Sequence, residues 1–494
     1  MLTGPFVHRT LCATVAGQKL HAYNYKKCMD FKGDAMKLDE MAAWIRPLSA
    51  GGGPRYLQIV DLIAAGIDRG LLRPGDRLPP QRTLAQLLDV DLTTVTRAYA
   101  EARHRKLLDA VTGRGSFIPA QTAEAGPSID LSMNIPPPPR GLRLGDLMDR
   151  GLAEVLSRSN VDQLMTYQVG AGSRADRSAA SKWLEPLLGH VEPERIVISA
   201  GAQAAIAALL STLTRPGDAV AADPLTYPGF LSAALQLGLK VVPAETDDEG
   251  IRPDALAACI RKHNPRLIYL TPTMQNPTTI TMPARRRRDI AKIAQTHNLP
   301  IIEDDPYSML AGDAPSPLAT TLPQQTYYIA TLSKSLTPGL RTAFVVVPDP
   351  AHMDPLLSAL RTFTLMPAPL MVSLVTNWIR DGSAVDLLNA VRDEAAIRQR
   401  LAKSILPASA RAHPNGLHIW QPLPAHWDRH RLVQAARQEG LGVTAADAFA
   451  LAAAPDAVRI SIGGVGERTR LAEALKTLAD IMNDQKIVRR AAIV

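Results

Sequence analysis

The stretch YIATLSKSLTPGLRTAFVVV, residues 328–347, contains two apolar runs on either side of a polar segment. Short apolar runs bounded by turn residues predict buried strands. Five similar runs precede them, with helical stretches between: Ile196–Ile198, Ala219–Ala221, Lys240–Val242, Leu267–Leu270 and Pro300–Ile302. Strands that alternate with helices in this way predict an α/β fold with a mixed, mostly parallel sheet covered by helices on both faces. From about residue 365 we expect helix followed by a small C-terminal α+β subdomain.

Residues 54–118 show a separate, self-contained pattern. It predicts a helix that includes Tyr56–Ile63 and stops at Gly70, a turn at Arg73–Asp76, helices at Thr83–Leu88 and Leu92–Leu107, and a hairpin of Leu107–Val111 with Ser116–Ile118 around Thr112–Gly115. Either Asp91 or Thr93 can cap the third helix. Three helices followed by a β-hairpin predict a winged helix-turn-helix.

The third helix and the hairpin tip have the residue types that contact DNA. A recognition helix needs short hydrogen-bonding side chains and arginines on one face. Thr93, Thr94, Thr96 and Arg97 supply them, and Arg82 opens the second helix, where it can contact phosphate; Val95, Ala98 and Tyr99 are expected to pack inward. Gly113 and Arg114 would bring the wing close to a groove. An alternative is a winged helix that binds protein instead of DNA.

The chain of 494 residues is too long for one core. We expect a partly disordered extension at residues 1–50, the winged helix-turn-helix at 51–119, a proline-rich linker at 120–141 and the large domain at 142–494. The segment that begins at Met36 is more typical of the start of a domain than the segment that begins at Met1. We therefore expect part of residues 1–35 to be a disordered extension, or the result of a translation start assigned too far upstream.

Composition favours a cytoplasmic protein with an anionic partner. The net charge is +8, but charge alone identifies no partner. Cys12, Cys28 and Cys259 are too few and too scattered for a disulfide framework or a metal site, which indicates a reducing compartment. No apolar stretch approaches a membrane span, and the first residues do not read as a secretory signal.

The large domain has the groups that a pyridoxal 5'-phosphate (PLP) site requires. Lys334 follows a predicted strand and would form the Schiff base, and Asp304 ends another and would keep the pyridine nitrogen protonated. The remaining candidates are assigned by their role: Tyr307 and Asn276 to the ring hydroxyl, Tyr227 to stacking on the ring, Ala202, Gln203, Thr331, Ser333 and Arg341 to the phosphate, and Arg459 to a substrate or effector carboxylate.

The run Arg285–Arg288 has two interpretations. A charge run at a helix start is usually a solvated face. The alternative is that it extends a DNA-binding surface onto the large domain, in which case its removal would flatten the salt dependence of operator binding.

Two family resemblances rest on these segments. LLRPGDRLPPQRTLA (71–85), TVTRAY (94–99) and TGRGSF (112–117) resemble the GntR regulators, in which the positions of Arg82, of the early third helix and of the wing glycine meet DNA; Leu92 departs from the usual polar or basic residue. About residues 130–485 resemble fold-type I aminotransferases. Ala202 there replaces a usual hydroxyl residue, and Thr279 a usual glycine. The leading motif IDLSMNIPP (129–137) is similar to the domain start of the MocR subfamily, which joins both modules.

This resemblance implies a homodimeric, PLP-dependent transcriptional regulator that binds double-stranded operator DNA and senses PLP, alone or with an amino acid or amine. Because Lys334, Asp304 and Arg459 are retained, the alternative is an active aminotransferase that carries a DNA-binding module. A third possibility is a DNA-binding scaffold that has lost the cofactor, which the complete set of PLP residues disfavours.

Overall fold

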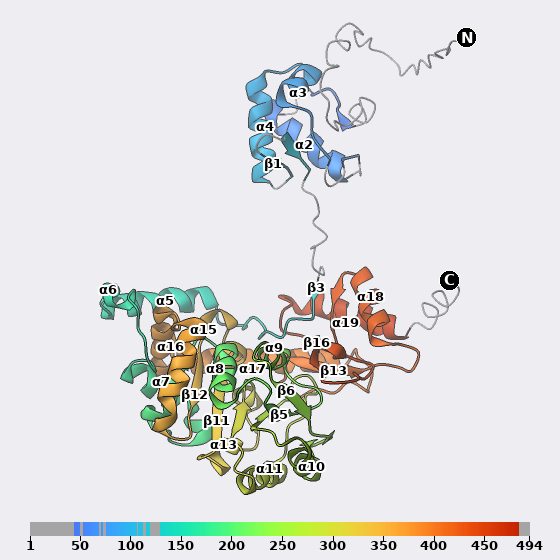
Figure 1. Ribbon diagram of the computed structural model, residues 1–494. Coiled ribbons are helices and arrows are strands. Elements are labelled where there is room, and N and C mark those ends of the chain that lie inside the picture. The colour runs from blue at the N-terminus through green and yellow to red at the C-terminus, as the bar shows by residue number, and fades with distance from the viewer. Residues whose placement is uncertain are drawn as a thin grey trace, which may run out of the picture. The chain divides into compact units, whose positions relative to one another are not determined.

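The computed structural model describes residues 44–49, 53–68, 71–72, 76–105, 107–111, 115–118 and 129–483. The chain divides into two compact units, residues 1–125 and 126–494, here called the small unit and the large unit (Figure 1). The expected stop at Gly70, most of the turn at Arg73–Asp76, the hairpin tip with Gly113 and Arg114, and residues 1–35 with Cys12 and Cys28 lie outside the described residues.

The small unit has the predicted winged helix-turn-helix. Its elements are α2 (Arg55–Asp68), α3 (Gln81–Leu88), α4 (Leu92–His104), β1 (Asp109–Val111) and β2 (Gly115–Phe117). The two strands pair antiparallel. Val95, Ala98 and Tyr99 are buried, as predicted, against α2 and α3, and the Tyr99 hydroxyl donates to the Pro79 carbonyl at 2.7 Å. Asp91 is the cap of α4, because its carboxylate accepts from the Thr93 backbone N–H.

A seven-stranded sheet forms the centre of the large unit. Its order is β4 (Ile196–Ser199), β12 (Ala343–Val346), β11 (Thr326–Thr331), β10 (Ile301–Asp304), β9 (Leu267–Leu270), β5 (Ala219–Ala222) and β6 (Lys240–Pro243). All seven predicted strands are present. Strand β12 runs antiparallel to both neighbours and the other pairs are parallel, which confirms the mixed, mostly parallel sheet.

Helices cover both faces of this sheet because strand side chains point alternately to opposite sides. One face packs on α8 (Ala202–Leu213), α9 (Pro228–Gln236) and α15 (Met353–Thr364). The other packs on α7 (Arg174–Leu188), α10 (Pro253–His263), α11 (Ala284–Thr296), α16 (Pro369–Asp381) and α17 (Ser383–Lys403). The shorter or peripheral elements are α5 (Leu144–Arg158), α6 (Val161–Leu164), β7 (Thr246–Asp247), β8 (Gly250–Ile251), α12 (Ser308–Ala311), α13 (Leu318–Thr321) and α14 (Leu332–Ser335).

The chain ends in the expected α+β subdomain. It contains β13 (His418–Pro422), α18 (Arg429–Gln438), β14 (Leu441–Gly442), β15 (Thr444–Ala445), β16 (Ala457–Ser461) and α19 (Arg468–Asn483). The buried Arg398 of α17 donates to the carbonyls of Ile462, Val465 and Gly466, and so ties α17 to the turn after β16.

Residues 129–141 belong to the large unit and not to a separate linker, which corrects the expected boundary at 141. Strand β3 (Ile129–Asp130) pairs in parallel with β14, and Leu131 is fully buried in the core of the C-terminal subdomain. The proline run at Pro136–Pro139 therefore follows residues that are part of the folded large unit. Among the described residues, no helix is long and apolar enough to cross a membrane.

Candidate functional site

The candidate site lies where several strands of the large sheet end. Asp304 is the last residue of β10, and Lys334 lies in α14, directly after β11. Ser199 of β4 and Thr331 of β11 both pair with Ala343 of β12, so the loops that follow these two strands leave the same edge of the sheet. Carboxyl ends of parallel strands are where open α/β sheets bind ligands.

Asp304 is a buried carboxylate with one oxygen in use. Its Oδ2 accepts from the Tyr269 hydroxyl at 2.7 Å, and its Oδ1 is buried with no hydrogen-bond partner. Burial raises the pKa of Asp304 to about 7, against the opposing effects of the Tyr269 hydrogen bond and of Lys334. Tyr269 itself stacks on Phe230, with ring centroids 3.8 Å apart. Asp304 is therefore held in place and has an oxygen left for a donor from a ligand.

Lys334 contacts the segment of the chain that contains Asn134. Its Nζ donates to the backbone carbonyl of Asn134. Burial lowers the pKa of Lys334 to about 8, with a further lowering from Arg459 and an opposing effect of Asp304. A lysine whose pKa is lowered in this way has a substantial neutral fraction near physiological pH, and the neutral amine is the nucleophile.

Tyr307 is the centre of a small buried network. Its hydroxyl accepts from Asn134 Nδ2 at 2.8 Å, and the same nitrogen lies 3.2 Å from His418 Nδ1. Burial raises the pKa of Tyr307 far above its usual range, so the hydroxyl stays protonated. Since the oxygen accepts from Asn134, the Tyr307 proton is available to a further acceptor.

The predicted phosphate residues meet around the start of α8. Gly201 precedes this helix with φ +90°, and a Cβ added to it would lie 2.9 Å from a nitrogen of Arg341. Arg341 donates to the Ala200 carbonyl at 3.2 Å, and Thr331 Oγ1 lies 3.2 Å from Ser333 Oγ. The amide of Gln203, however, donates to the Gly229 carbonyl, and Ala202 offers only its backbone N–H.

Arg459 and Asn276 are in direct contact. Arg459 lies in β16, is buried, and donates to Asn276 Oδ1 at 2.9 Å and to the Ser132 carbonyl at 2.5 Å. Two of the Arg459 nitrogens thus have partners within the chain, while its buried Nε has none. Tyr227 is half-buried, and burial raises its pKa, with Asp304 raising it further and Arg341 and Arg459 opposing. Asp304, Arg341 and Arg459 are therefore close enough to Tyr227 to affect its pKa.

The two departures from the aminotransferase pattern have different consequences. Thr279 has φ +65°, a left-handed conformation that a glycine adopts without strain and a β-branched residue rarely adopts. Its backbone N–H donates to the Gln275 carbonyl at 2.7 Å, which supports this conformation. Ala202, the first residue of α8, has no hydroxyl and can offer a ligand only its backbone N–H.

The candidate DNA-binding face lies on α3 and α4 of the small unit. Arg82, Thr93, Thr96 and Arg97 are exposed and Thr94 is half-buried. The guanidinium of Arg97 lies over the Tyr56 ring at 4.1 Å, and Thr96 Oγ1 lies 2.8 Å from Gln81 Oε1. Leu92, which departs from the family pattern, is 37% exposed at the first position of α4. Gly113 and Arg114 were predicted here too and lie outside the described residues.

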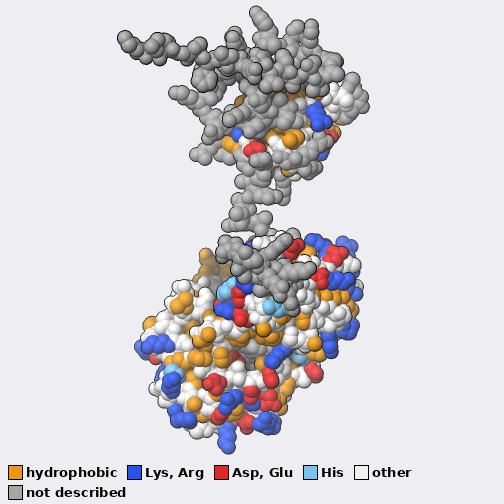
Figure 2. Space-filling view, turned by 90° about the vertical axis from the view of Figure 1, so that its right-hand side faces the viewer, with side chains coloured by type: hydrophobic (Ala, Val, Ile, Leu, Met, Phe, Trp, Pro, Cys, Tyr) orange, Lys and Arg blue, Asp and Glu red, His pale blue; other side chains and the backbone are white. Residues whose placement is uncertain are grey.

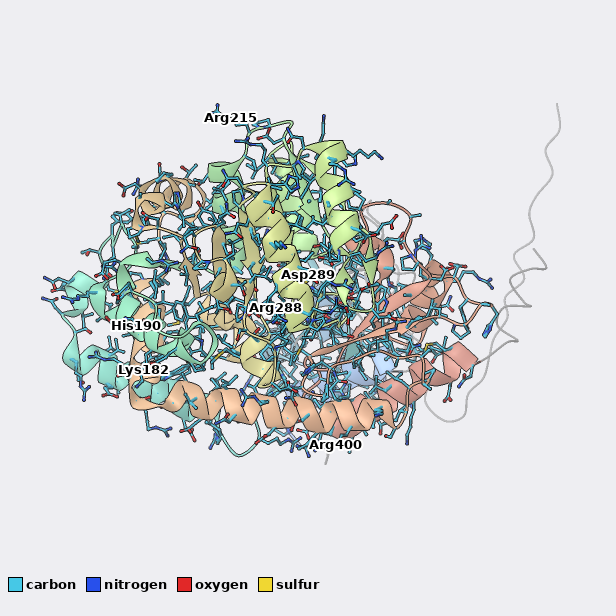
Figure 3. The ribbon with its side chains drawn as sticks, turned by 90° about the horizontal axis from the view of Figure 1, so that it is seen from below. Lys182, His190, Arg215, Arg288, Asp289 and Arg400 are labelled. Carbon is cyan, nitrogen blue, oxygen red and sulfur yellow. The ribbon has the colours of Figure 1, made fainter. Side chains whose placement is uncertain are left out.

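The arginine run fits neither interpretation as a whole. Arg286 is buried and pairs with Asp247 and Glu249, at 2.9 and 2.8 Å, and Arg287 is buried and donates to the carbonyls of Met282 and Pro272. The other two are exposed, and Figure 3 labels Arg288 next to Asp289 on α11. Basic and acidic side chains are also mixed on the face of the large unit in Figure 2. Half of the run is thus structural and unavailable to DNA.

Sequence reasoning missed four residues that complete the site: Asn134, Ser132, Tyr269 and His418. The sequence did contain a signal for Asn134 and Ser132. Both lie in the motif at residues 129–137, which resembles a family motif although it has no strand or helix pattern. Tyr269 lies within the predicted strand Leu267–Leu270, and His418 lies in the C-terminal region, where no individual strand was predicted; no sequence signal distinguished either residue.

Comparisons with known proteins agree with both modules. Residues 55–118 match the bacterial regulatory proteins of the gntR family, and residues 129–478 match aminotransferase class I and II. The chain belongs to the aminotransferase class I and II family. Its GntR-type module followed by this domain is the arrangement of the MocR subfamily, as the sequence resemblance implied.

Two named relatives align with most of this chain. The chain is 28% identical to the HTH-type transcriptional regulator YdeF of Bacillus subtilis, over 90% of this chain and 97% of that protein. It is 29% identical to the vitamin B6 salvage pathway transcriptional repressor PtsJ of Salmonella typhimurium, over 83% and 94%. A solved structure, the kynurenine aminotransferase of Pyrococcus horikoshii, has a TM-score of 0.67 at 22% identity, over 75% of this chain and 93% of that one, and shows the shared fold.

Proposed function

We propose that this aminotransferase-family chain is a PLP-dependent transcriptional regulator. The small unit would bind operator DNA, and the large unit would bind PLP and respond to it, alone or together with an amino acid or amine. The observation that carries the proposal is the pairing, in one chain, of an exposed recognition helix with a buried site in which Asp304 has an unused oxygen near Lys334.

The residues present fit PLP. A protonated pyridine nitrogen is the donor that Asp304 Oδ1 lacks, and the absence of a Cβ at Gly201 leaves room beside Arg341 for a phosphate at the start of α8. When bound, PLP supplies an aldehyde that condenses with amines and a ring that withdraws electrons. Tyr227 would lie against the ring, and Thr331 and Ser333 would add hydroxyl donors to the phosphate.

Each polar residue then has a defined task. Lys334 supplies the neutral amine, and Asp304 holds a proton at the ring nitrogen. Tyr307 donates its hydroxyl proton to the ring oxygen, because Asn134 already donates to the Tyr307 oxygen. The amide nitrogen of Asn276 can reach the same oxygen, since its Oδ1 is engaged by Arg459.

Arg459 would select the effector. A planar guanidinium binds a carboxylate through two parallel hydrogen bonds. The buried Nε of Arg459 has no partner, so the pair of Nε with a neighbouring nitrogen offers that geometry. An effector with a carboxylate next to an amine would satisfy Arg459 with one end and reach Lys334 with the other.

On the DNA side, Arg82 and the exposed residues of α4 would contact phosphates and base edges, with Gly113 and Arg114 at the wing. We infer a homodimer in the cytoplasm, with each small unit on one half-site, because such operators repeat with the symmetry of the protein. The second candidate function is an active aminotransferase, which is favoured by the presence of Lys334, Asp304 and Arg459 in one site.

Absorbance and DNA binding together test the proposal. Purified protein with PLP should show the visible band of a lysine-bound cofactor, which Lys334→Ala abolishes and Lys182→Ala, at an exposed position on α7, leaves intact. A duplex selected from random sequences by the wild type should then bind with an affinity that changes when PLP is added. Unchanged affinity would contradict the regulator, and multiple turnovers with an amino donor and a keto acid would establish the aminotransferase.

A further inference from the structure

We propose that residues 129–135, here called the leading segment, sense the occupancy of the ligand site and that Asn134 is the positioning residue through which they do so. This inference rests on the proposed function, because it concerns how a bound ligand would reach the DNA-binding unit. It assigns a role to a stretch that the sequence presents as the start of a domain.

Two carbonyls of the leading segment are held by the two cations that a ligand would engage. The carbonyl of Asn134 accepts from Lys334 Nζ, and the carbonyl of Ser132 accepts from Arg459 at 2.5 Å. Hydrogen bonds from ionised donors are stronger than those between neutral groups. The position of the leading segment therefore depends on the state of Lys334 and Arg459.

The side chain of Asn134 makes a third link. Its amide nitrogen donates to the Tyr307 hydroxyl at 2.8 Å and lies 3.2 Å from His418 Nδ1. Burial and Arg459 lower the pKa of His418 to about 3, so the ring is neutral and Nδ1 can accept. Both amide hydrogens of Asn134 are then used, and this fixes the Tyr307 oxygen as an acceptor with its own proton directed elsewhere.

The remaining contacts tie the leading segment to the C-terminal subdomain. Ile129 and Asp130 pair with β14, and the Ser461 N–H of β16 donates to the Leu131 carbonyl at 2.7 Å. Gly463 lies so close to Ile135 that an added Cβ would come within 1.8 Å of the Ile135 carbonyl oxygen. One short segment thus joins the C-terminal subdomain to the site, and its N-terminal end continues along the chain toward the small unit.

Ligand binding would remove the hydrogen bond from Lys334 Nζ to the Asn134 carbonyl. When bound, PLP would supply an aldehyde that condenses with the neutral amine of Lys334 and releases water. The Lys334 Nζ would then no longer be an ammonium donor to the Asn134 carbonyl. A carboxylate at Arg459 would compete with Ser132 in the same way, so the leading segment would lose both carbonyl contacts as the site fills, while the Asn134 side chain stays on Tyr307.

Hydrogen exchange of the full-length wild type gives the direct test. Amides of the leading segment should exchange at least threefold faster with PLP than without it, while peptides from the centre of the large sheet do not. Equal or slower exchange at full cofactor occupancy, read from the absorbance band, would overturn the proposal.

A variant tests the coupling. At a PLP occupancy matched to that of the wild type by the absorbance band, Asn134→Ala should reduce the PLP-induced change in affinity for the selected duplex at least fivefold; Met133→Ala, at a residue that is 60% exposed, should respond like the wild type. If Asn134→Ala does not fold, Tyr307→Phe removes the hydrogen bond between the two side chains, and its change in affinity is compared with that of the wild type at the same PLP occupancy. A full response to PLP in these variants overturns this inference and leaves the proposed function standing, whereas a wild type that shows no response contradicts the function itself.

Discussion

The recognition helix α4 and the ligand site of the large unit contain similar residue types, but these side chains are mostly exposed on the helix and mostly buried in the site. On α4 the threonine side chains and Arg97 are exposed or half-buried, whereas Tyr99 packs inward and burial raises its pKa. In the large unit Asp304, Tyr307 and Lys334 are enclosed, and burial shifts the pKa of each. The comparison teaches that substitutions on the helix should have graded, salt-dependent effects, while those at buried groups should act on stability or on ligand binding as a whole.

The largest expected effect comes from a buried cation. Arg287→Ala should lower the free energy of unfolding of the large unit by about 3 kcal/mol or more, because it removes the Arg287 donor to the Met282 carbonyl and one of the two donors to the Pro272 carbonyl, and leaves the space of a buried side chain empty. Arg288→Ala, at the exposed neighbour, should stay within about 0.5 kcal/mol of the wild type. Urea unfolding followed by tryptophan fluorescence measures both, and equal losses would refute the assignment of Arg287 to the core.

The pH dependence of stability is the next test. Folded Asp304 has a pKa of about 7, above the usual 3.8, so between those values the folded state holds a proton that the unfolded state has released. The free energy of unfolding should therefore fall as pH rises from about 4 to about 7 in the ligand-free protein. Asp304→Asn should reduce this slope by up to about 1.4 kcal/mol per pH unit. Parallel curves for variant and wild type would show that Asp304 is ionised throughout.

On the small unit the effects should be smaller. Asp91→Ala removes the cap of α4 and should cost about 1 kcal/mol of the stability of this unit, since one backbone N–H loses its acceptor. Asp61→Ala, an exposed acid on α2, serves as the control. Thermal unfolding resolved for the small unit would decide, and no difference between the two variants would count against the cap.

Arg97→Ala should have the smallest effect on the free energy of unfolding, but it should measurably change the salt dependence of DNA binding. Loss of the contact with Tyr56 costs about 0.5–1 kcal/mol of stability. If Arg97 contacts a phosphate, the slope of log affinity against log salt should decrease by about 1, uniformly over different duplexes. Arg103→Ala, further along the same helix, should keep the wild-type slope; the reverse pattern would move the DNA contact to the end of α4.

Much of this architecture was predictable, because strands and helices leave local patterns. The apolar runs indicated all seven strands, and the inward positions of α4 followed from helical spacing. Asn134 could not be assigned, since its partners Tyr307, Lys334 and His418 lie far along the chain and only the fold brings them together. The burial of Arg286 likewise depends on a hairpin, β7–β8, whose acids at Asp247 and Glu249 have no signal in the run itself.

The antiparallel return of β12 has a consequence for how such proteins can diverge or be redesigned. The register pairs Thr331 with Ala343, so residues 332–342 connect two neighbouring strands. Lys334 and Arg341 both lie in this connection, and an insertion or deletion between them would change their spacing. A redesign of the site would therefore have to move the lysine and the arginine together with the segment that joins them.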